Sequence, residues 1–360
     1  MVLTSKEEID MQKDEFSVTL LRRYPEESTK KTGLGVYADN LENILDKASV
    51  PHNAIEFKID IKDGMGVFFL RGIFRPFLNV LKHRKSEVCH IADELCGIFT
   101  PFIHGKKVLT VHHVVKGGES SVLYRWYWRF ATKMAVANSD MVIAASPQTK
   151  KELIHELKVH EDKIVTFYSS IRDIYVPKNL EREKIIGGIG ELIPRKNFTK
   201  LIRAFAIFVS MRDTQDYHLK ICGKGEQYGE LIELIEELGL KDKVTIVSNL
   251  TVDQVVDFYN RIMVLANPSL HEGLGLVTLE AQKCGTPVVC IRGADIPEDV
   301  TRYAIFANKD DQDFADKIHK VIVNQKYRNH MIEMGKEYAD NFGKDFSENI
   351  LELYCSILKK

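Results

Sequence analysis

The sequence predicts an α/β protein built from two facing, doubly wound, Rossmann-like domains. Its 360 residues exceed the size at which a single hydrophobic core stops growing, and 44% apolar residues can fill two cores. Short β-rich segments alternate with amphipathic helical segments, which is typical of a parallel sheet covered by helices on both faces. After a charged stretch near residues 177–184 the alternation starts again. A second sheet of the same kind is therefore predicted.

Six segments of the first half are predicted to be strands from their β-branched and apolar residues. They are Ser17–Arg23, Glu56–Lys62, Val88–Asp93, Lys107–His113, Met141–Ser146 and Lys163–Ser170. The second half repeats the pattern at Ile185–Gly190, His218–Cys222, Val244–Ser248, Ile262–Asn267, Pro287–Ile291 and Tyr303–Ala307. We expect the first domain to span residues 1–178 and the second 179–345. An amphipathic helix over 346–360 follows the last strand.

Charge and cysteine content exclude several classes of protein. The 50 basic and 51 acidic residues nearly cancel, so no net field favours nucleic acid as a partner. The six cysteines form no C-x-x-C pair, which argues against a zinc site or a disulfide framework. The first fifteen residues are charged throughout and no apolar run reaches the length of a membrane span. A cytoplasmic protein is expected.

The most informative segment is NPSLHEGLGLVTLE, residues 267–280. A buried strand is predicted to end at its start, and Gly273 and Gly275 let the following loop approach a ligand closely. A helix is predicted to begin near Leu276 and Val277. The free N–H groups and the dipole at its start suit a phosphate or a sugar hydroxyl.

Two glutamates lie in this segment, Glu272 in the loop and Glu280 further along, in the helix. Their carboxylates can reach opposite ends of one elongated ligand. The alternative is an ordinary strand–loop–helix unit with solvated glutamates, which a glutamate pair alone would favour. The flanking Pro-Ser, the two glycines and the following EAQKCGTPVV reverse that preference.

This segment resembles the signature of the family 4 retaining glycosyltransferases, P-S-x-x-E-G-x-G-x-x-x-x-E-A-x-x-x-G-x-P-V-V. The resemblance implies that Glu272 contacts the donor sugar and that Glu280 holds the ribose hydroxyls. It also implies that Gly223, in a strand-end G-K-G, and Leu250 lie near the nucleotide. The fold that it implies is GT-B, in which the helix over 346–360 returns to the first domain.

A second element of the resemblance is GGIGELIPRKN, residues 187–197. A strand that delivers a glycine and then a lysine to a helix N-terminus can cradle a diphosphate, although such a pattern alone is more often a turn with a surface lysine. The family has an Arg and a Lys here that neutralise the donor diphosphate. Lys196 matches the Lys, whereas Glu191 stands where the Arg is expected and would repel phosphate. Arg195 can supply the missing charge.

The first domain contributes two further matches. Gly33 and Gly35 lie in a G-x-G-x-Y pattern that resembles the family's loop near the donor phosphate and sugar; a surface loop is the alternative. His112 matches a strand-end histidine of the family, while His113 replaces the usual Asp. The resemblance implies that His112 hydrogen-bonds the donor sugar and stabilises developing positive charge. We interpret His90 as structural.

Together these features predict a retaining glycosyltransferase that moves a sugar from a nucleotide diphosphate sugar to a hydroxyl acceptor. Because Lys196, Arg195 and a helix N-terminus would neutralise the diphosphate, we expect no metal and no cofactor apart from this substrate. A sugar-nucleotide epimerase of the same fold is one alternative. A non-catalytic nucleotide-sugar-binding protein is the other, and Glu191 is its best support.

The segment SVLYRWYWRFATKM, residues 121–134, is predicted to be a helix with an apolar stripe of Leu123, Tyr127, Phe130 and Met134 toward the sheet. Trp128 would lie on the opposite face near Arg125 and Arg129, a combination found at membrane interfaces. A similar amphipathic helix is predicted through residues 70–81. Two hypotheses remain open: peripheral membrane contact with a lipid-linked acceptor, or a Trp128 that is simply buried.

Overall fold

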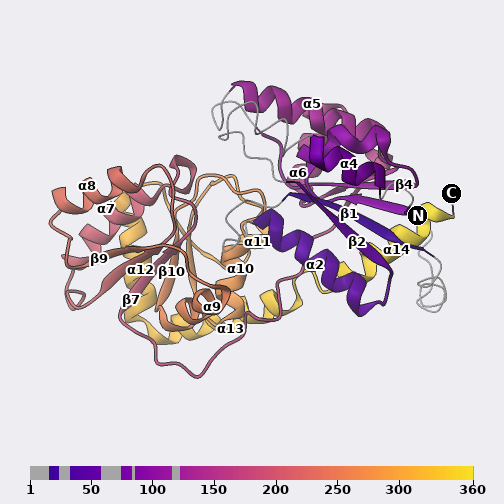
Figure 1. Ribbon diagram of the computed structural model, residues 1–360. Helices are drawn as coiled ribbons and strands as arrows, with labels where there is room; N and C mark the ends of the chain where they lie inside the picture. Colours follow the sequence, from indigo (N-terminus) through magenta and orange to yellow (C-terminus); the bar gives the residue numbers. More distant parts are fainter. Residues whose placement is uncertain (1–15, 24–32, 58–73, 83–85, 116–121, 360) are drawn as a thin grey trace. The chain divides into compact units, whose positions relative to one another are not determined.

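A computed structural model describes residues 16–23, 33–57, 74–82, 86–115 and 122–359. The chain folds into two compact units (Figure 1). Unit 1 consists of Met1–Ser170 and Gly343–Lys360, and unit 2 of Ile171–Phe342. The division thus falls at residue 170 instead of 178, and the return to unit 1 at residue 343 instead of 346. None of the described helices is long and apolar enough to cross a lipid bilayer.

Unit 1 contains a parallel sheet with the strand order β2-β1-β3-β4-β5-β6. Its strands are β1 (Val18–Arg23), β2 (His52–Phe57), β3 (Val88–Ile91), β4 (Lys106–Val111), β5 (Met141–Ala144) and β6 (Ile164–Thr166). All but β2 match their predicted segments to within a few residues. In β2, His52 pairs with Val18, and Ile55 and Phe57 are buried. The strand therefore begins four residues before the predicted segment, where buried and exposed side chains already alternate. Residues 58–62 of the predicted segment lie outside the described residues.

Helices cover both faces of this sheet (Figure 1). One face carries α4 (Arg75–Lys82), the 3-10 helix η4 (Glu94–Phe102), α5 (Val122–Asn138) and α6 (Pro147–Leu157); a short 3-10 turn, η5 (Glu161–Lys163), precedes β6. The other face carries α2 (Gly33–Lys47) and α14 (Phe346–Leu358). Each face has its own apolar core, and α14, which follows unit 2 in the sequence, completes one of the two cores of unit 1.

A buried hydrogen-bond network joins α14 to the centre of the sheet. The two ring nitrogens of His90 contact the Tyr354 hydroxyl at 2.5 Å and the Thr110 hydroxyl at 2.8 Å, and Tyr37 contacts Thr110 at 2.8 Å. Burial lowers the pKa of His90 to about 3. The ring is therefore neutral at physiological pH, in keeping with the structural role predicted for it.

Helix α5 turns a different face to the sheet from the one predicted. Trp128, expected on the exposed side, is 1% exposed and donates its indole N–H to Glu94 Oε1 at 2.9 Å. Phe130, expected on the buried side, is 47% exposed. The cause is the close packing of η4 against α5. Gly97 of η4 lies so near Ala131 of α5 that an added Cβ would be 2.2 Å from the Ala131 carbonyl oxygen. Small residues, and not the apolar stripe, decide which side of α5 is buried.

Unit 2 contains a second parallel sheet, with the order β12-β11-β10-β7-β8-β9. Its strands are β7 (Ile185–Ile189), β8 (His218–Cys222), β9 (Val244–Val247), β10 (Val264–Asn267), β11 (Val288–Ile291) and β12 (Ile305–Ala307). The chain winds outward from β7 in both directions, so the strand order reverses between β7 and β10. Open α/β sheets bind ligands at the carboxyl ends of the strands beside such a reversal. Both sheets are parallel and doubly covered, which confirms the predicted Rossmann-like fold.

The helices of unit 2 also form two layers (Figure 1). One core is formed with α7 (Phe198–Val209), α8 (Tyr228–Glu237) and α12 (Asp311–Val323). The other helices are η6 (Pro194–Lys196), α9 (Val252–Arg261), α10 (Leu276–Lys283), α11 (Glu298–Thr301) and α13 (Gln325–Asn341). Helix α10 packs against α9 and α13, and it begins directly after the loop that contains Glu272.

One arginine fixes the carboxyl ends of α9 and α10. Arg182 donates to the carbonyl oxygens of Tyr259 at 2.8 Å, Ile262 at 2.7 Å and Gly285 at 2.7 Å. A cation is favourable there because the last carbonyls of a helix lack intrahelical partners and carry partial negative charge. Arg182 therefore ties the two helices together at the ends away from the α10 N-terminus.

Candidate active site

The turn after β7 brings Lys196 back over the end of its own strand. Gly190 has a φ of 150°, and a Cβ there would lie 3.2 Å from Lys196 Cε, so the lysine stem runs directly across this glycine. Lys196 is buried except for 8% of its surface. Asn197, in the left-handed conformation, then starts α7. The turn thus presents an ammonium group at the carboxyl edge of the sheet.

The loop after β10 brings Glu272 to the same place. Its carboxylate forms an ion pair with Lys196, lies 3.2 Å from Arg195 Nη1, and accepts a hydrogen bond from the Ser269 hydroxyl at 2.7 Å. The two loops are also joined by their backbones, because the Leu270 N–H donates to the Arg195 carbonyl at 2.9 Å. Two predicted cations and a predicted carboxylate therefore meet at the reversal between β7 and β10.

The cations keep Glu272 ionised. Burial alone would raise its pKa, but the Lys196 ammonium, Arg195 and the Ser269 hydroxyl outweigh burial and lower the pKa below the ordinary glutamate value. The Glu272 carboxylate is consequently paired with Lys196 and Arg195, the same two cations that a bound diphosphate would need. Sequence reasoning did not single out Ser269, although the Pro-Ser of the motif was a signal for it.

The α10 N-terminus lies directly after this loop. Gly275, with a φ of 75°, is the N-cap of α10, and no side chain caps the helix. The first N–H groups, at Leu276 and Val277, have no intrahelical acceptor by helix geometry, and Gly273 adds no side chain to the preceding loop. This end of α10 can bind an anion beside Lys196 and Arg195.

Glu280, one turn further along α10, is held by a tyrosine that the sequence analysis did not identify. The Tyr259 hydroxyl donates to Glu280 Oε2 at 2.9 Å, and Tyr175 also hydrogen-bonds this carboxylate. Burial raises the pKa of Glu280, while the two tyrosine hydroxyls and the nearby Arg172 oppose that rise. The carboxylate is thus oriented by neutral donors, unlike that of Glu272.

The remaining predicted residues of unit 2 lie at the neighbouring strand ends. Gly223 directly follows β8 and packs against the backbone of Gly190. A Cβ at Gly223 would lie 1.9 Å from the Gly190 carbonyl oxygen. Leu250 follows β9 and directly precedes Thr251, whose side chain caps α9. Because all strands are parallel, these residues share one edge of the sheet with Lys196. Glu191 is exposed at this edge.

In unit 1, His112 lies just past the end of β4. Its Nε2 contacts the Ala92 carbonyl at 3.0 Å, so Nε2 carries the hydrogen, and its ring packs edge-on against Tyr37 at 4.7 Å. Burial lowers the pKa of His112 despite that hydrogen bond, which leaves the ring neutral. Gly33 and Gly35, predicted in a loop, instead lie in the first turn of α2. The preceding residue, Thr32, is outside the described part of the chain.

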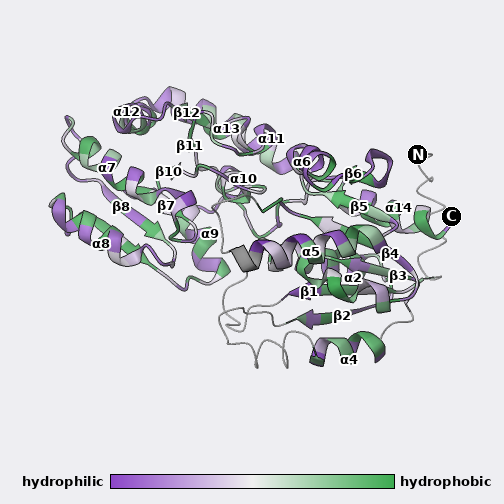
Figure 2. Ribbon diagram, turned by 90° about the horizontal axis from the view of Figure 1, so that it is seen from above, coloured by the Kyte–Doolittle hydropathy of each residue, from purple (hydrophilic) through white to green (hydrophobic). Residues whose placement is uncertain are grey.

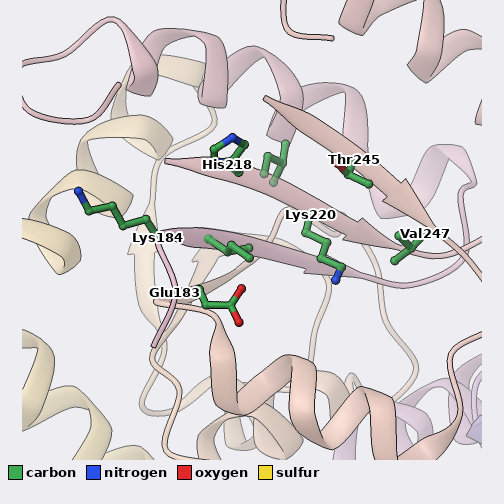
Figure 3. Close-up of a pocket in the computed structure, with 8 residues that line it drawn as sticks. Glu183, Lys184, His218, Lys220, Thr245 and Val247 are labelled. Atoms are coloured by element: carbon green, nitrogen blue, oxygen red, sulfur yellow. The ribbon is translucent and has the colours of Figure 1, made fainter. Parts of the chain in front are cut away.

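A separate hollow of about 390 Å³ contains none of these residues (Figure 3). It is lined by Glu183 and Lys184 before β7, by His218 and Lys220 of β8 and by Val247 of β9, among others. Most of these residues lie at the amino ends or in the middle of their strands, and of the five only Val247 ends its strand. The carboxyl edge, where Lys196, Arg195 and Glu272 meet at the reversal between β7 and β10, is therefore the stronger candidate site.

Two family models match the chain: "Glycosyl transferases group 1" over residues 170–338 and "Glycosyltransferase Family 4" over residues 57–172. The O-antigen chain mannosyltransferase RfbU of Salmonella typhimurium is 29% identical over 53% of this chain and 53% of its own length. The D-inositol 3-phosphate glycosyltransferase of Corynebacterium jeikeium is 34% identical over 46% of this chain and 41% of its own. The chain thus spans about half the length of these curated relatives. The structure of Anabaena Alr3699/HepE in complex with UDP and glucose superposes with a TM-score of 0.72 at 14% identity, covering 95% of this chain and 100% of that one.

Proposed function

Since this chain belongs to the group 1 and family 4 glycosyltransferases with a GT-B fold, we propose that it transfers a sugar from a nucleotide diphosphate sugar to a hydroxyl acceptor. The observation that carries the proposal is the cluster of Lys196, Arg195 and Glu272 beside the uncapped α10 N-terminus. Two cations and a helix N-terminus suit a diphosphate, and a carboxylate in their midst suits sugar hydroxyls.

The residue roles follow from this assignment. Lys196, Arg195 and the N–H groups from Gly273 to Val277 would bind the diphosphate, and Glu280 would accept hydrogen bonds from the ribose hydroxyls. Gly223 and Leu250 would border the nucleotide. For unit 1 the proposed roles are those that the resemblance implies: His112 hydrogen-bonds the sugar, and the α2 N-terminus at Gly33 and Gly35 approaches the donor.

We further propose that the transfer retains the anomeric configuration. Loss of the diphosphate leaves an oxocarbenium-like sugar, and the acceptor hydroxyl adds to the same face while a phosphate oxygen takes its proton. Glu272, held by two cations, is a poor nucleophile and acts by positioning and electrostatics. The name of the mannosyltransferase relative supports a glycan hydroxyl as the acceptor. The glycan would be either free or linked to a lipid.

Donor binding is expected to stabilise the protein against heat. UDP-, GDP- and ADP-sugars should be screened by thermal shift, because a ligand at about 100 times its Kd adds about 2.7 kcal/mol to the free energy of unfolding. With the selected donor and a glycan acceptor, proton NMR of the product should show the anomeric configuration of the donor. An inverted product would refute retention, and an isomerised sugar nucleotide formed without acceptor would indicate the epimerase.

Nucleotide binding is expected to weaken as the pH falls through the pKa of Glu280, because the protonated acid can no longer accept from both ribose hydroxyls. Tyr259→Phe removes a hydroxyl that lowers this pKa. The variant should therefore lose nucleoside diphosphate binding at a higher pH than the wild type, as measured by calorimetry over a pH series. Tyr228→Phe, an exposed tyrosine on α8, is the control. An unchanged midpoint would remove Glu280 from ribose binding.

A further inference from the structure

The outer surface of unit 1 collects exposed apolar side chains on one helical layer. Among the described residues, eleven large apolar side chains are exposed, and five of them belong to α4, η4 and α5 or the residue before α4. These five are Phe74, Leu78, Phe102, Trp126 and Phe130. Single exposed apolar residues are ordinary, but their concentration on one layer marks an interaction surface.

Helix α5 contributes a regular stripe to this surface. Trp126, Arg129, Phe130 and Lys133 are exposed at positions i, i+3, i+4 and i+7, which lie on one side of a helix. The Trp126 and Phe130 rings stack with their planes 2° apart and their centroids 5.7 Å apart. Trp126 is 64% exposed, whereas Trp128 on the opposite side is buried against Glu94.

Helix α4 repeats the arrangement. Phe74, Leu78 and Lys82 are exposed four residues apart, with Arg75 beside them. Phe102, at the end of η4, contacts Phe77 of α4 with ring centroids 5.0 Å apart, and η4 packs against α5. The two stripes and Phe102 therefore belong to one layer over one face of the sheet, and hydrophilic and hydrophobic residues mix on both helices (Figure 2). We call this surface the α4–α5 face.

All charges of the two helices are positive. Neither α4 nor α5 contains Asp or Glu, and together they contain five Arg and Lys residues. Arg75, Lys82, Arg129 and Lys133 are exposed, and none of them pairs with a carboxylate of the described residues. A surface that combines unpaired cations with exposed tryptophan and phenylalanine matches the anionic headgroup layer of a membrane in both charge and polarity.

We propose that the α4–α5 face docks on the surface of an anionic lipid bilayer. A protein partner fits less well, because lysine is depleted from protein interfaces, whereas here Lys133 lies within the α5 stripe and Lys82 ends the α4 stripe. The rings enter the headgroup boundary while the cations stay at phosphate level. This inference is independent of the donor site and concerns where the protein acts.

The test uses the intact protein and vesicles of phosphatidylcholine with or without phosphatidylglycerol. The wild type should float with the anionic vesicles at low salt and be released at high salt, because exposed charges are then screened. Arg129→Gln with Lys133→Gln should weaken binding roughly 30-fold, at about 1 kcal/mol for each cation. Trp126→Ala with Phe130→Ala should weaken binding about tenfold or more.

The two tryptophans of the chain supply a second readout. Vesicles should shift the Trp126 emission to shorter wavelength, and the shift should vanish in Trp126→Ala, where only the buried Trp128 remains. Tyr228→Ala and the pair Lys309→Gln with Lys326→Gln, exposed positions of unit 2, are matched controls that should bind as the wild type does. Only variants whose melting temperature equals that of the wild type are compared, so that a loss of binding does not reflect unfolding.

Three outcomes would overturn the proposal. One is a wild type that stays unbound to anionic vesicles at low salt, and another is binding that survives both double substitutions. The third is self-association that light scattering detects in the wild type and not in Trp126→Ala with Phe130→Ala, because the face would then bind a second copy of the chain.

Discussion

Replacing Glu272 by glutamine is expected to lower kcat by about 10²–10³-fold while nucleoside diphosphate binding stays intact or becomes tighter. The loss follows if the carboxylate stabilises the reacting sugar, since removal of one such electrostatic group typically costs this much. The gain follows from the structure, where Glu272 holds Lys196 and Arg195, the two cations that the diphosphate needs. Without the carboxylate both cations are free for the phosphates.

Lys196→Gln should do the opposite and weaken nucleoside diphosphate binding by about 1.5–3 kcal/mol, the usual worth of a charged hydrogen bond. Calorimetry with the nucleoside diphosphate and initial-rate kinetics with the donor separate the two effects. Glu298→Gln, an exposed glutamate on α11, is the control. If Glu272→Gln lost binding and turnover in parallel with its melting temperature, the residue would be structural and the proposed site would be wrong.

Arg182→Met is expected to destabilise unit 2 by about 3–5 kcal/mol, which corresponds to a melting temperature lower by about 10 °C. The substitution keeps the apolar stem but removes the donors to the carbonyls of Tyr259, Ile262 and Gly285, which stay buried. Differential scanning calorimetry measures the change. Arg212→Met, at an exposed arginine, should leave the melting temperature nearly unchanged. If Arg182→Met lowered the melting temperature as little as Arg212→Met, water would be replacing the Arg182 guanidinium at these helix ends.

The fold class and every strand position except that of β2 followed from the sequence, because the apolar pattern of a buried strand is local in the sequence. The site depended on a contact that does not: Lys196 and Glu272 are 76 residues apart, and only the reversal of strand order between β7 and β10 brings them together. Tyr259, which orients Glu280, belongs to a different helix and gave no motif signal. Family resemblance pointed to both glutamates and to Lys196, whereas the contacts that hold the two carboxylates required the fold.

The prediction for α5 failed for an energetic reason. Its largest apolar residues suggested one buried side, but Trp128 gains a buried partner for its indole N–H at Glu94, and Ala131 allows η4 to approach. Burial raises the pKa of Glu94 to about 7, with Asp93 adding to the effect. Such a pairing between a helix and a distant carboxyl group is invisible to helical periodicity, and it left Trp126 and Phe130 on the outside.

The return of the chain to unit 1 has a consequence for biosynthesis. Tyr354, which completes the network around His90, belongs to Gly343–Lys360, a segment of unit 1 that is translated only after the whole of unit 2. At typical synthesis rates the ribosome needs roughly 10–30 s to produce the intervening unit 2. During that time the nascent first unit lacks α14 and exposes the apolar face that this helix covers. Unit 2, which is contiguous, can therefore finish folding first, and the earlier-made half of the chain matures last.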